Sequence, residues 1–148
     1  MVDRCSRHRS IRTCNSFNIM SYTFSKRSRE NLSTCHQDLQ AVAMYAIKYV
    51  DFTVIEGHRG KEAQNRAFDE GYSKVKFPHG KHNKKPSDAF DFIPHPFKGW
   101  DDHEGFAKIG NMMLGVGAIL KEYGLIESEF EYGGNWTTFK DYPHIQRV

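Results

Sequence analysis

GKHNKKPSDAFDFIP, residues 80–94, contains a polar loop followed by a short apolar segment. AFDFI, residues 89–93, is predicted to form a strand that carries Asp91, whereas His82 lies in the loop before it. The wider region, residues 72–100, is rich in proline and glycine and is predicted to consist mostly of loops. A long loop inside a domain is usually functional if it is not disordered. This stretch is therefore the first place to look for a site.

The segments on either side predict helices and one further strand. Apolar residues recur at helical spacing over residues 39–50, and the β-branched, aromatic segment FTVIEG, residues 52–57, is typical of a strand. A polar helix is predicted over residues 61–71, ended by Gly71. The longest predicted helix is capped by Asp101 or Asp102, runs to about Tyr123 and ends before Gly124. Its predicted apolar stripe contains Phe106, Ile109, Met113, Val116, Leu120 and Tyr123.

The chain length of 148 residues fits one domain, which we place at residues 20–148. Residues 1–19 lack periodicity and are rich in arginine, serine and cysteine, so we expect a disordered or non-native extension before Met20. Residues 1–32 carry a formal charge of +5, which leaves −2 for the rest of the chain. A basic tail can bind an anionic surface, but the domain itself shows no nucleic-acid footprint.

The cysteines and the hydropathy pattern limit where in the cell the protein is expected to be made. The three cysteines, Cys5, Cys14 and Cys35, are odd in number and form no CxxC pair, which predicts neither a disulfide framework nor a cysteine zinc site. They suit a protein made in a reducing cytoplasm. We see no apolar run of about 18 residues and no signal peptide, so neither a membrane span nor export through a signal sequence is predicted.

Histidine and carboxylate residues occur together in two segments. The eight histidines include His82, nine residues before Asp91, and His144 in DYPHIQ, residues 141–146, three residues after Asp141. A catalytic zinc ion uses three protein ligands, and His, Asp and His would supply them. The second carboxylate would then accept a proton from the attacking water. The alternative is that these are ordinary polar loop residues, with Asp141 capping a turn at Pro143.

The same two segments resemble the signatures of the D-alanyl-D-alanine and L-alanyl-D-glutamate metallopeptidases. That family pairs an S-x-H-x-x-G-x-A-x-D type motif with a later [DE]-x-x-H. His82, Ala89 and Asp91 match the first motif, and Asp141 and His144 match the second. Residues 56–77 resemble the family's arginine-bearing segment, and residues 132–136 with DYPHIQ resemble its closing strand. The resemblance covers about residues 22–148 and is strongest to phage endolysins.

The resemblance implies a role for each matched residue. It implies one Zn²⁺ held by His82, Asp91 and His144, with Asp141 as the base. Arg59 would bind the substrate carbonyl or oxyanion, and Ser73 would contact the substrate.

Three departures from the common pattern bear on these roles. His82 and Asp91 are nine rather than seven residues apart, which leaves Asp88 as a competing ligand. Gly80 stands where the motif usually has serine, and Asp141 stands in place of glutamate. His79 and His95 flank the site in sequence and are possible supporting residues.

The resemblance further implies an α+β fold, with a small antiparallel sheet and packed helices as in hedgehog and D,D-peptidase domains. We expect a monomeric phage endolysin that hydrolyses the L-alanyl-D-glutamate bond of the peptidoglycan stem peptide. Such an enzyme would accumulate in the host cytoplasm and reach the periplasmic peptidoglycan through a holin pore. The alternatives are a D,D-carboxypeptidase or dipeptidase, and a zinc-bearing domain that binds cell wall without catalysis.

Overall fold

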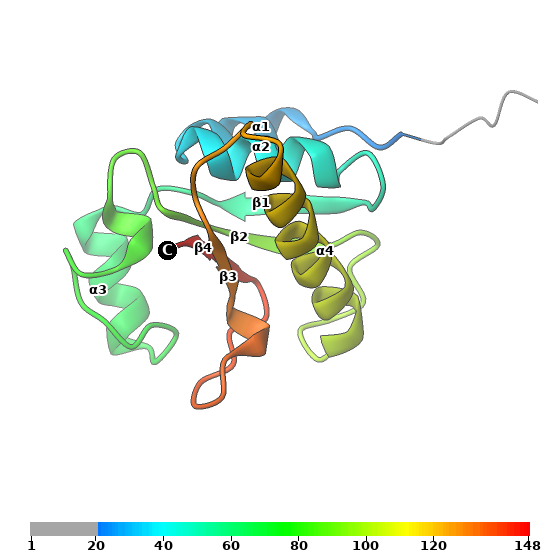
Figure 1. The fold of residues 1–148 in the computed structure, drawn as a ribbon. Helices are drawn as coiled ribbons and strands as arrows, with labels where there is room; N and C mark the ends of the chain where they lie inside the picture. The colour runs from blue at the N-terminus through cyan, green and yellow to red at the C-terminus, as the bar shows by residue number, and fades with distance from the viewer. Residues whose placement is uncertain (1–20) are drawn as a thin grey trace, which may run out of the picture.

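The computed structural model describes residues 21–148, and the predicted extension at residues 1–19 lies outside them. Four antiparallel strands form one sheet in the order β1-β2-β4-β3, with β1 at Phe52–Glu56, β2 at Ala89–Pro94, β3 at Phe130–Tyr132 and β4 at His144–Arg147. The helices are α1 at Lys26–Ser33, α2 at Gln37–Ala46, α3 at Lys61–Asp69 and α4 at His103–Glu122, with short 3₁₀ helices η1 at Lys81–Asn83 and η2 at Gly133–Asn135. The α+β prediction is confirmed. Figure 1 shows α3 standing apart from the other three helices, at the opposite end of the molecule from α4.

Side chains along β2 and β4 alternate between the hydrophobic core and the opposite face of the sheet, where the site lies. Phe90 and Phe92 of β2 are fully buried in the hydrophobic core with Ile145 of β4, Tyr132 of β3 and the buried faces of α2 and α4. Successive strand side chains point to opposite faces of a sheet. Asp91, between the two phenylalanines, therefore lies on the other face. Its direct cross-strand partner is His144, next to Ile145.

The structure corrects three details of the helices. α1 was not predicted, because only Ser28 and Leu32 of its eight residues are buried and so short a polar segment shows no clear period. α2 ends at Ala46 rather than at residue 50. Tyr123 is 77% exposed and lies outside the apolar stripe of α4, because the helix ends at Glu122 and the chain turns at Gly124 with a φ of 70°.

The predicted closing strand is two strands. β3 leads into η2, and a loop over residues 136–143 returns the chain antiparallel to it as β4. No helix among residues 21–148 is both long enough and apolar enough to cross a membrane.

A buried carboxylate ties α2 to the segment before β3. One oxygen of Asp38, Oδ2, accepts hydrogen bonds from the backbone N–H of Glu127 and from the N–H and hydroxyl of Ser128, at 3.2, 3.0 and 2.6 Å. Burial by itself would raise the pKa of Asp38, but the hydrogen bonds from Ser128 and Glu127 outweigh it and hold the pKa below its ordinary value. The ionised form of Asp38 therefore stabilises this junction.

The stabilisation by Asp38 should depend on pH. Because the pKa in the folded protein is below the unfolded value of about 3.9, the contribution is present above about pH 4 and is lost as the pH falls through the lower pKa. We expect Asp38→Asn to lower the free energy of unfolding by about 1–3 kcal/mol at pH 7. In urea unfolding, the stability difference between wild type and Asp38→Asn should narrow towards pH 3. The substitution Glu122→Gln, at an exposed glutamate, should show little difference from wild type at either pH. A difference for Asp38→Asn that stays constant with pH would contradict this.

Candidate metal centre

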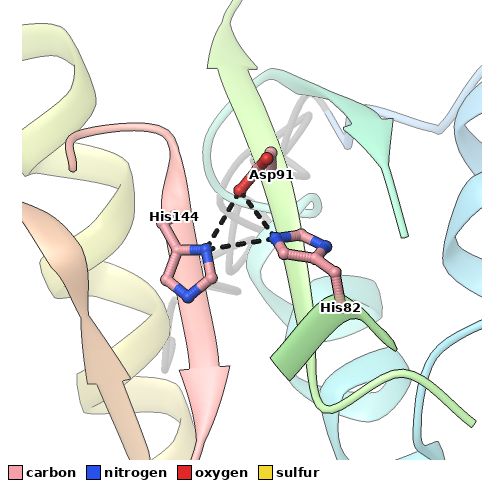
Figure 2. A group of neighbouring side chains, drawn as sticks. All are labelled: His82, Asp91 and His144. Atoms are coloured by element: carbon pink, nitrogen blue, oxygen red, sulfur yellow. Dashed lines mark hydrogen bonds and ion pairs between the residues drawn. The ribbon is translucent and has the colours of Figure 1, made fainter. Parts of the chain in front are cut away.

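Three side chains from separate elements converge on one point. His82 Nε2 lies 3.2 Å from Asp91 Oδ1, His144 Nδ1 lies 3.1 Å from the same oxygen, and the two nitrogens are 3.2 Å apart. Figure 2 shows the three groups pointing toward one another from η1, β2 and β4. His82 and His144 are buried, at 5% and 7% exposure. The atoms form a nearly equilateral triangle.

Secondary structure explains how each group reaches the triangle. The register of β2 and β4 pairs Asp91 with His144 directly, which places them side by side on the face opposite the core. His82 comes from η1, which is held to the sheet region because the Arg59 backbone N–H donates to the His82 carbonyl at 2.8 Å.

Hydrogen bonds on the far sides of both imidazoles orient their lone pairs. His82 Nδ1 lies 2.7 Å from the carbonyl oxygen of Gly57, and His144 Nε2 lies 3.0 Å from Oε1 of Gln146. An oxygen of either kind accepts only, so these nitrogens carry the hydrogens when the rings are neutral. His82 Nε2 and His144 Nδ1 then direct lone pairs at Asp91, as metal-ligating histidines do. Neither Gly57 nor Gln146 carries a recognisable sequence signal for this role.

The triangle fits a metal ion. Zinc at 2.0–2.1 Å from tetrahedral ligands separates the ligand atoms by about 3.3–3.4 Å, close to the observed 3.1–3.2 Å. Three acceptors this close repel one another unless a cation or a proton lies between them. Burial alone would raise the pKa of Asp91, but the neighbouring His82 and His144 hold it well below its ordinary value. His82, Asp91 and His144 can thus hold a divalent cation.

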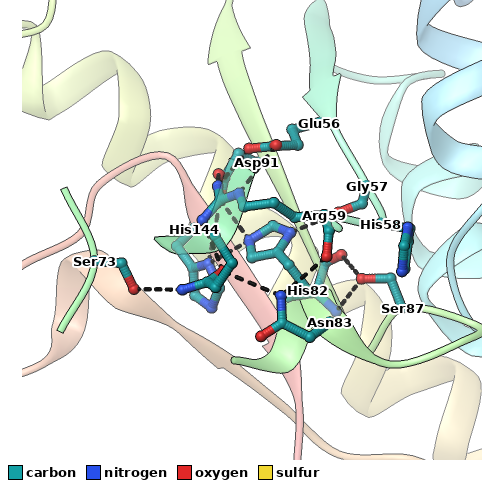
Figure 3. Close-up of polar contacts among 12 residues, drawn as sticks. Glu56, Gly57, His58, Arg59, Ser73, His82, Asn83, Ser87, Asp91 and His144 are labelled. Carbon is teal, nitrogen blue, oxygen red and sulfur yellow. Dashed lines mark hydrogen bonds and ion pairs between the residues drawn. The ribbon is translucent and has the colours of Figure 1, made fainter. Parts of the chain in front are cut away.

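Arg59 fixes the second oxygen of Asp91. Its Nη2 donates to Asp91 Oδ2 at 3.2 Å, its Nε donates to Glu56 Oε1 at 3.0 Å, and Nη2 also pairs with Glu56 Oε2. Figure 3 shows this polar network. With Oδ2 engaged by Arg59, Oδ1 is left to face the two histidines. The predicted arginine thus lies at the site, and its observed side-chain partners are the carboxylates of Glu56 and Asp91 and the amide of Gln64.

Asp141 lies beside the triangle on the loop that leads into β4. Its backbone N–H donates to the Gly133 carbonyl at 3.1 Å, and a Cβ on Gly133 would come within 2.4 Å of the Asp141 carbonyl oxygen. Only glycine allows this approach of the two backbones. Burial, and next the negative charge of Asp91, raise the pKa of the Asp141 carboxyl, although His144, His82 and Arg59 oppose this.

Gln64 is a buried residue of the site that sequence reasoning missed. Its side-chain Nε2 donates to Ser73 Oγ at 2.8 Å and to the Val75 carbonyl at 2.7 Å, while its Oε1 accepts from Arg59 Nη1 at 3.4 Å and from Asn83 Nδ2 at 3.2 Å. Every donor and acceptor site of the amide is used. Gln64 is 1% exposed on the otherwise polar helix α3, so no periodicity distinguishes it in the sequence.

A cleft of about 640 Å³ surrounds the triangle and contains all the predicted site residues. The residues that line it include Arg59, Ser73, His82, Asp91, Asp141 and His144, together with His79, Trp100, Trp136 and Phe139. Of the flanking histidines, His79 lies on its wall, whereas His95 lines a separate hollow. His103 stacks on Tyr142, next to Asp141, at 4.1 Å between ring centroids.

Asp88, the competing carboxylate, faces a different partner. Its Oδ1 accepts from Arg147 Nε at 2.9 Å, its backbone carbonyl accepts from the Arg147 N–H at 2.8 Å, and Lys84 Nζ lies 3.6 Å from Oδ2. The side chain is 5% exposed and is not among the residues that line the cleft. Asp88 thus holds the end of β4 in place.

Asp88 and Asp91 should respond differently to the same substitution. We expect Asp88→Asn to lower the free energy of unfolding by about 1–3 kcal/mol, because it weakens a buried charged hydrogen bond, and to leave metal binding intact. Asp91→Asn should instead reduce metal content. Urea unfolding and metal analysis of both purified variants would check this. Metal loss in Asp88→Asn with full retention in Asp91→Asn would reverse the assignment.

Comparisons with known proteins all match the chain to L-alanyl-D-glutamate peptidases. A family model described as phage L-alanyl-D-glutamate peptidase matches residues 20–148. The chain is 34% identical over 130 residues to the L-alanyl-D-glutamate peptidase of Escherichia phage T5, covering 83% of this chain and 88% of that protein. It is 32% identical over 117 residues to the peptidoglycan L-alanyl-D-glutamate endopeptidase CwlK of Bacillus subtilis (strain 168). That match covers 72% of this chain and 66% of CwlK.

A solved structure is similar over nearly the same region. The crystal structure of the Serratia marcescens L-Ala D-Glu endopeptidase ChiX matches with a TM-score of 0.69 and 30% identity, over 89% of this chain and 94% of that one. The similarity therefore extends over most of the chain.

Proposed function

This chain belongs to the family of phage L-alanyl-D-glutamate peptidases, and on that premise we propose that it is a zinc-dependent endolysin that cuts the L-alanyl-D-glutamate bond of the peptidoglycan stem peptide. The observation that carries the proposal is the convergence of His82 Nε2, Asp91 Oδ1 and His144 Nδ1, with Asp141 in the same cleft. Two neutral imidazoles and one carboxylate are a ligand set used by catalytic zinc.

The residues divide the work of hydrolysis between them. When bound, zinc lowers the pKa of a water ligand to about 7 and polarises the scissile carbonyl. The Asp141 carboxylate accepts a proton from the attacking water and delivers it to the departing amine nitrogen. Asp141 sits on a loop whose backbone is fixed against Gly133, which holds the carboxylate on one side of the triangle.

Arg59 and Ser73 support the site in different ways. Four hydrogen bonds occupy the Arg59 guanidinium among the described residues, and a guanidinium has five N–H groups. We propose that the fifth, on Nη1, binds the substrate carbonyl or the developing oxyanion. The Ser73 hydroxyl is engaged with Gln64 and Val75, so it shapes the cleft wall, and direct contact with substrate stays a prediction.

The proposed setting follows from the substrate. Peptidoglycan lies outside the cytoplasmic membrane, so we propose that the enzyme accumulates in the host cytoplasm and acts after release through a holin pore. We propose that it works as a monomer, because the three ligands, the proposed base and Arg59 all line one cleft, so the site needs no residue from a second copy.

Lysis of permeabilised Gram-negative cells tests the function. We expect turbidity to fall with the purified enzyme, to stay constant with a chelator, and to fall again after zinc is added back. Mass spectrometry of the fragments should show new amino termini on D-glutamate. Release of D-alanine instead would indicate a D,D-carboxypeptidase. Zinc binding without any cleavage would indicate a binding domain.

A further inference from the structure

The substrate of the proposed function brings a negative charge into the cleft. A D-glutamate residue has two carboxyl groups, and whichever one continues the stem peptide, the other is a free carboxylate close to the scissile amide. A cation near the metal centre would pair with that carboxylate and favour this substrate over an uncharged one.

The cleft offers three permanent cations, of which one is paired with carboxylates and one is tied to a backbone carbonyl. Arg59 is paired with Glu56 and Asp91, and the Lys81 ammonium donates to the Arg147 backbone carbonyl at 2.8 Å. Lys74 forms no ion pair with any carboxylate among residues 21–148. Its ammonium lies over the ring of Phe139, 4.6 Å from the centroid. Lys81 also lacks a carboxylate partner, but its ammonium is tied to the end of β4, so Lys74 is the cleft cation that no hydrogen bond or ion pair within residues 21–148 holds.

The backbone that carries Lys74 is tied to the metal site. The residues on both sides of it, Ser73 and Val75, accept hydrogen bonds from the buried amide of Gln64. Ser73 Oγ also donates to the Val75 carbonyl at 3.1 Å, which closes a small turn with Lys74 at its tip. Gln64 in turn contacts Arg59, which holds Asp91. An unbroken chain of polar contacts thus fixes the backbone around Lys74 relative to a metal ligand, while the side chain itself is exposed.

The opposite wall completes the arrangement. Phe139 lies two residues before Asp141 on the loop between η2 and β4, and both residues line the cleft with Lys74. The aromatic ring holds the ammonium through a cation–π contact, leaving its N–H groups to bind an anion. The cation is thus held against the same loop that carries the proposed base.

We infer that Lys74 is the specificity-determining residue that binds the free carboxylate of the D-glutamate on the leaving side of the scissile bond. The assignment rests on the proposed function and identifies the residue that recognises the D-glutamate side of the substrate. It makes the enzyme selective for an acidic residue after the cut, because an uncharged residue at that position leaves Lys74 without its partner.

Two matched peptides and three lysine variants test the assignment. One peptide carries the stem sequence with the free glutamate carboxylate, and the other carries a carboxamide of the same shape at that position. We expect wild-type kcat/KM to be about tenfold or more higher for the acid, the size of a charge-assisted hydrogen bond. In Lys74→Met, kcat/KM for the acid peptide should fall to the level of the amide peptide. The kcat/KM for the amide peptide should equal that of the wild type.

The other two variants serve as controls. Lys76 is two residues away, pairs with Asp69 at 3.9 Å and does not line the cleft, so Lys76→Met should keep the wild-type preference. Lys81→Met should also keep the wild-type preference for the acid peptide. The same loss on both peptides in Lys74→Met, or loss of the preference in Lys81→Met instead, would overturn the assignment. A wild-type enzyme that cuts neither peptide would overturn the proposed function itself.

Discussion

Asp141→Asn is expected to lower kcat by about 10²–10⁴-fold on a soluble stem peptide, because it removes the group proposed to accept and return the proton. The same variant should keep one zinc ion per chain, since Asp141 is not part of the triangle of His82, Asp91 and His144. Steady-state kinetics and metal analysis of the same preparation would measure both. Asparagine has nearly the shape of aspartate, so the loop against Gly133 should be retained.

The separation of turnover from metal binding is what makes this test decisive. Asp69→Asn is a suitable control, because Asp69 is an exposed carboxylate outside the cleft whose one ion-pair partner among residues 21–148 is Lys76. It should keep wild-type kinetics. If Asp141→Asn retained near-normal kcat, Asp141 would not be the base. If it lost zinc and activity together, its role would be that of a ligand.

His82→Ala and His144→Ala should each abolish both zinc binding and activity. Removing either imidazole leaves only two of the three ligand atoms that face the centre. The wild-type enzyme should also unfold at a higher temperature with zinc, because a ligand that binds only the folded state at about 100 times its Kd stabilises it by about 2.7 kcal/mol. For a domain of this size, that corresponds to about 5–10 °C. Neither variant should show this shift.

Thermal unfolding with and without zinc gives a readout that is independent of catalysis. His95→Ala is the matched control, since His95 is exposed and does not line the cleft. It should keep both the zinc-dependent shift and the activity. A normal shift in His82→Ala and in His144→Ala would remove the proposed ligand set, even if both variants were inactive.

The sequence determined the main elements and the chemical content of the site. The apolar spacing over residues 39–50, and that from the cap at Asp101 or Asp102 to about Tyr123, located α2 and α4, because the burial of one helical face repeats every three to four residues. AFDFI located β2. The spacing of nine residues from His82 to Asp91 and the Asp141-x-x-His144 spacing, with the family resemblance, selected residues that the fold brings into one cleft. These features are local, so they can be recognised from neighbouring residues alone.

Only the tertiary structure showed how the site residues are held and where the competing carboxylate points. The motif favoured Asp91 because it follows Ala89, although the spacing left Asp88 as a competitor. The register of β2 against β4 places Asp91 opposite His144, whereas Asp88 turns to Arg147. Gln64 could be recognised as a site residue only from the structure, because α3, η1 and the turn around Lys74 meet at its amide. These contacts join residues far apart in the chain. Their geometry depends on how sheet and helices pack, and no local spacing records it.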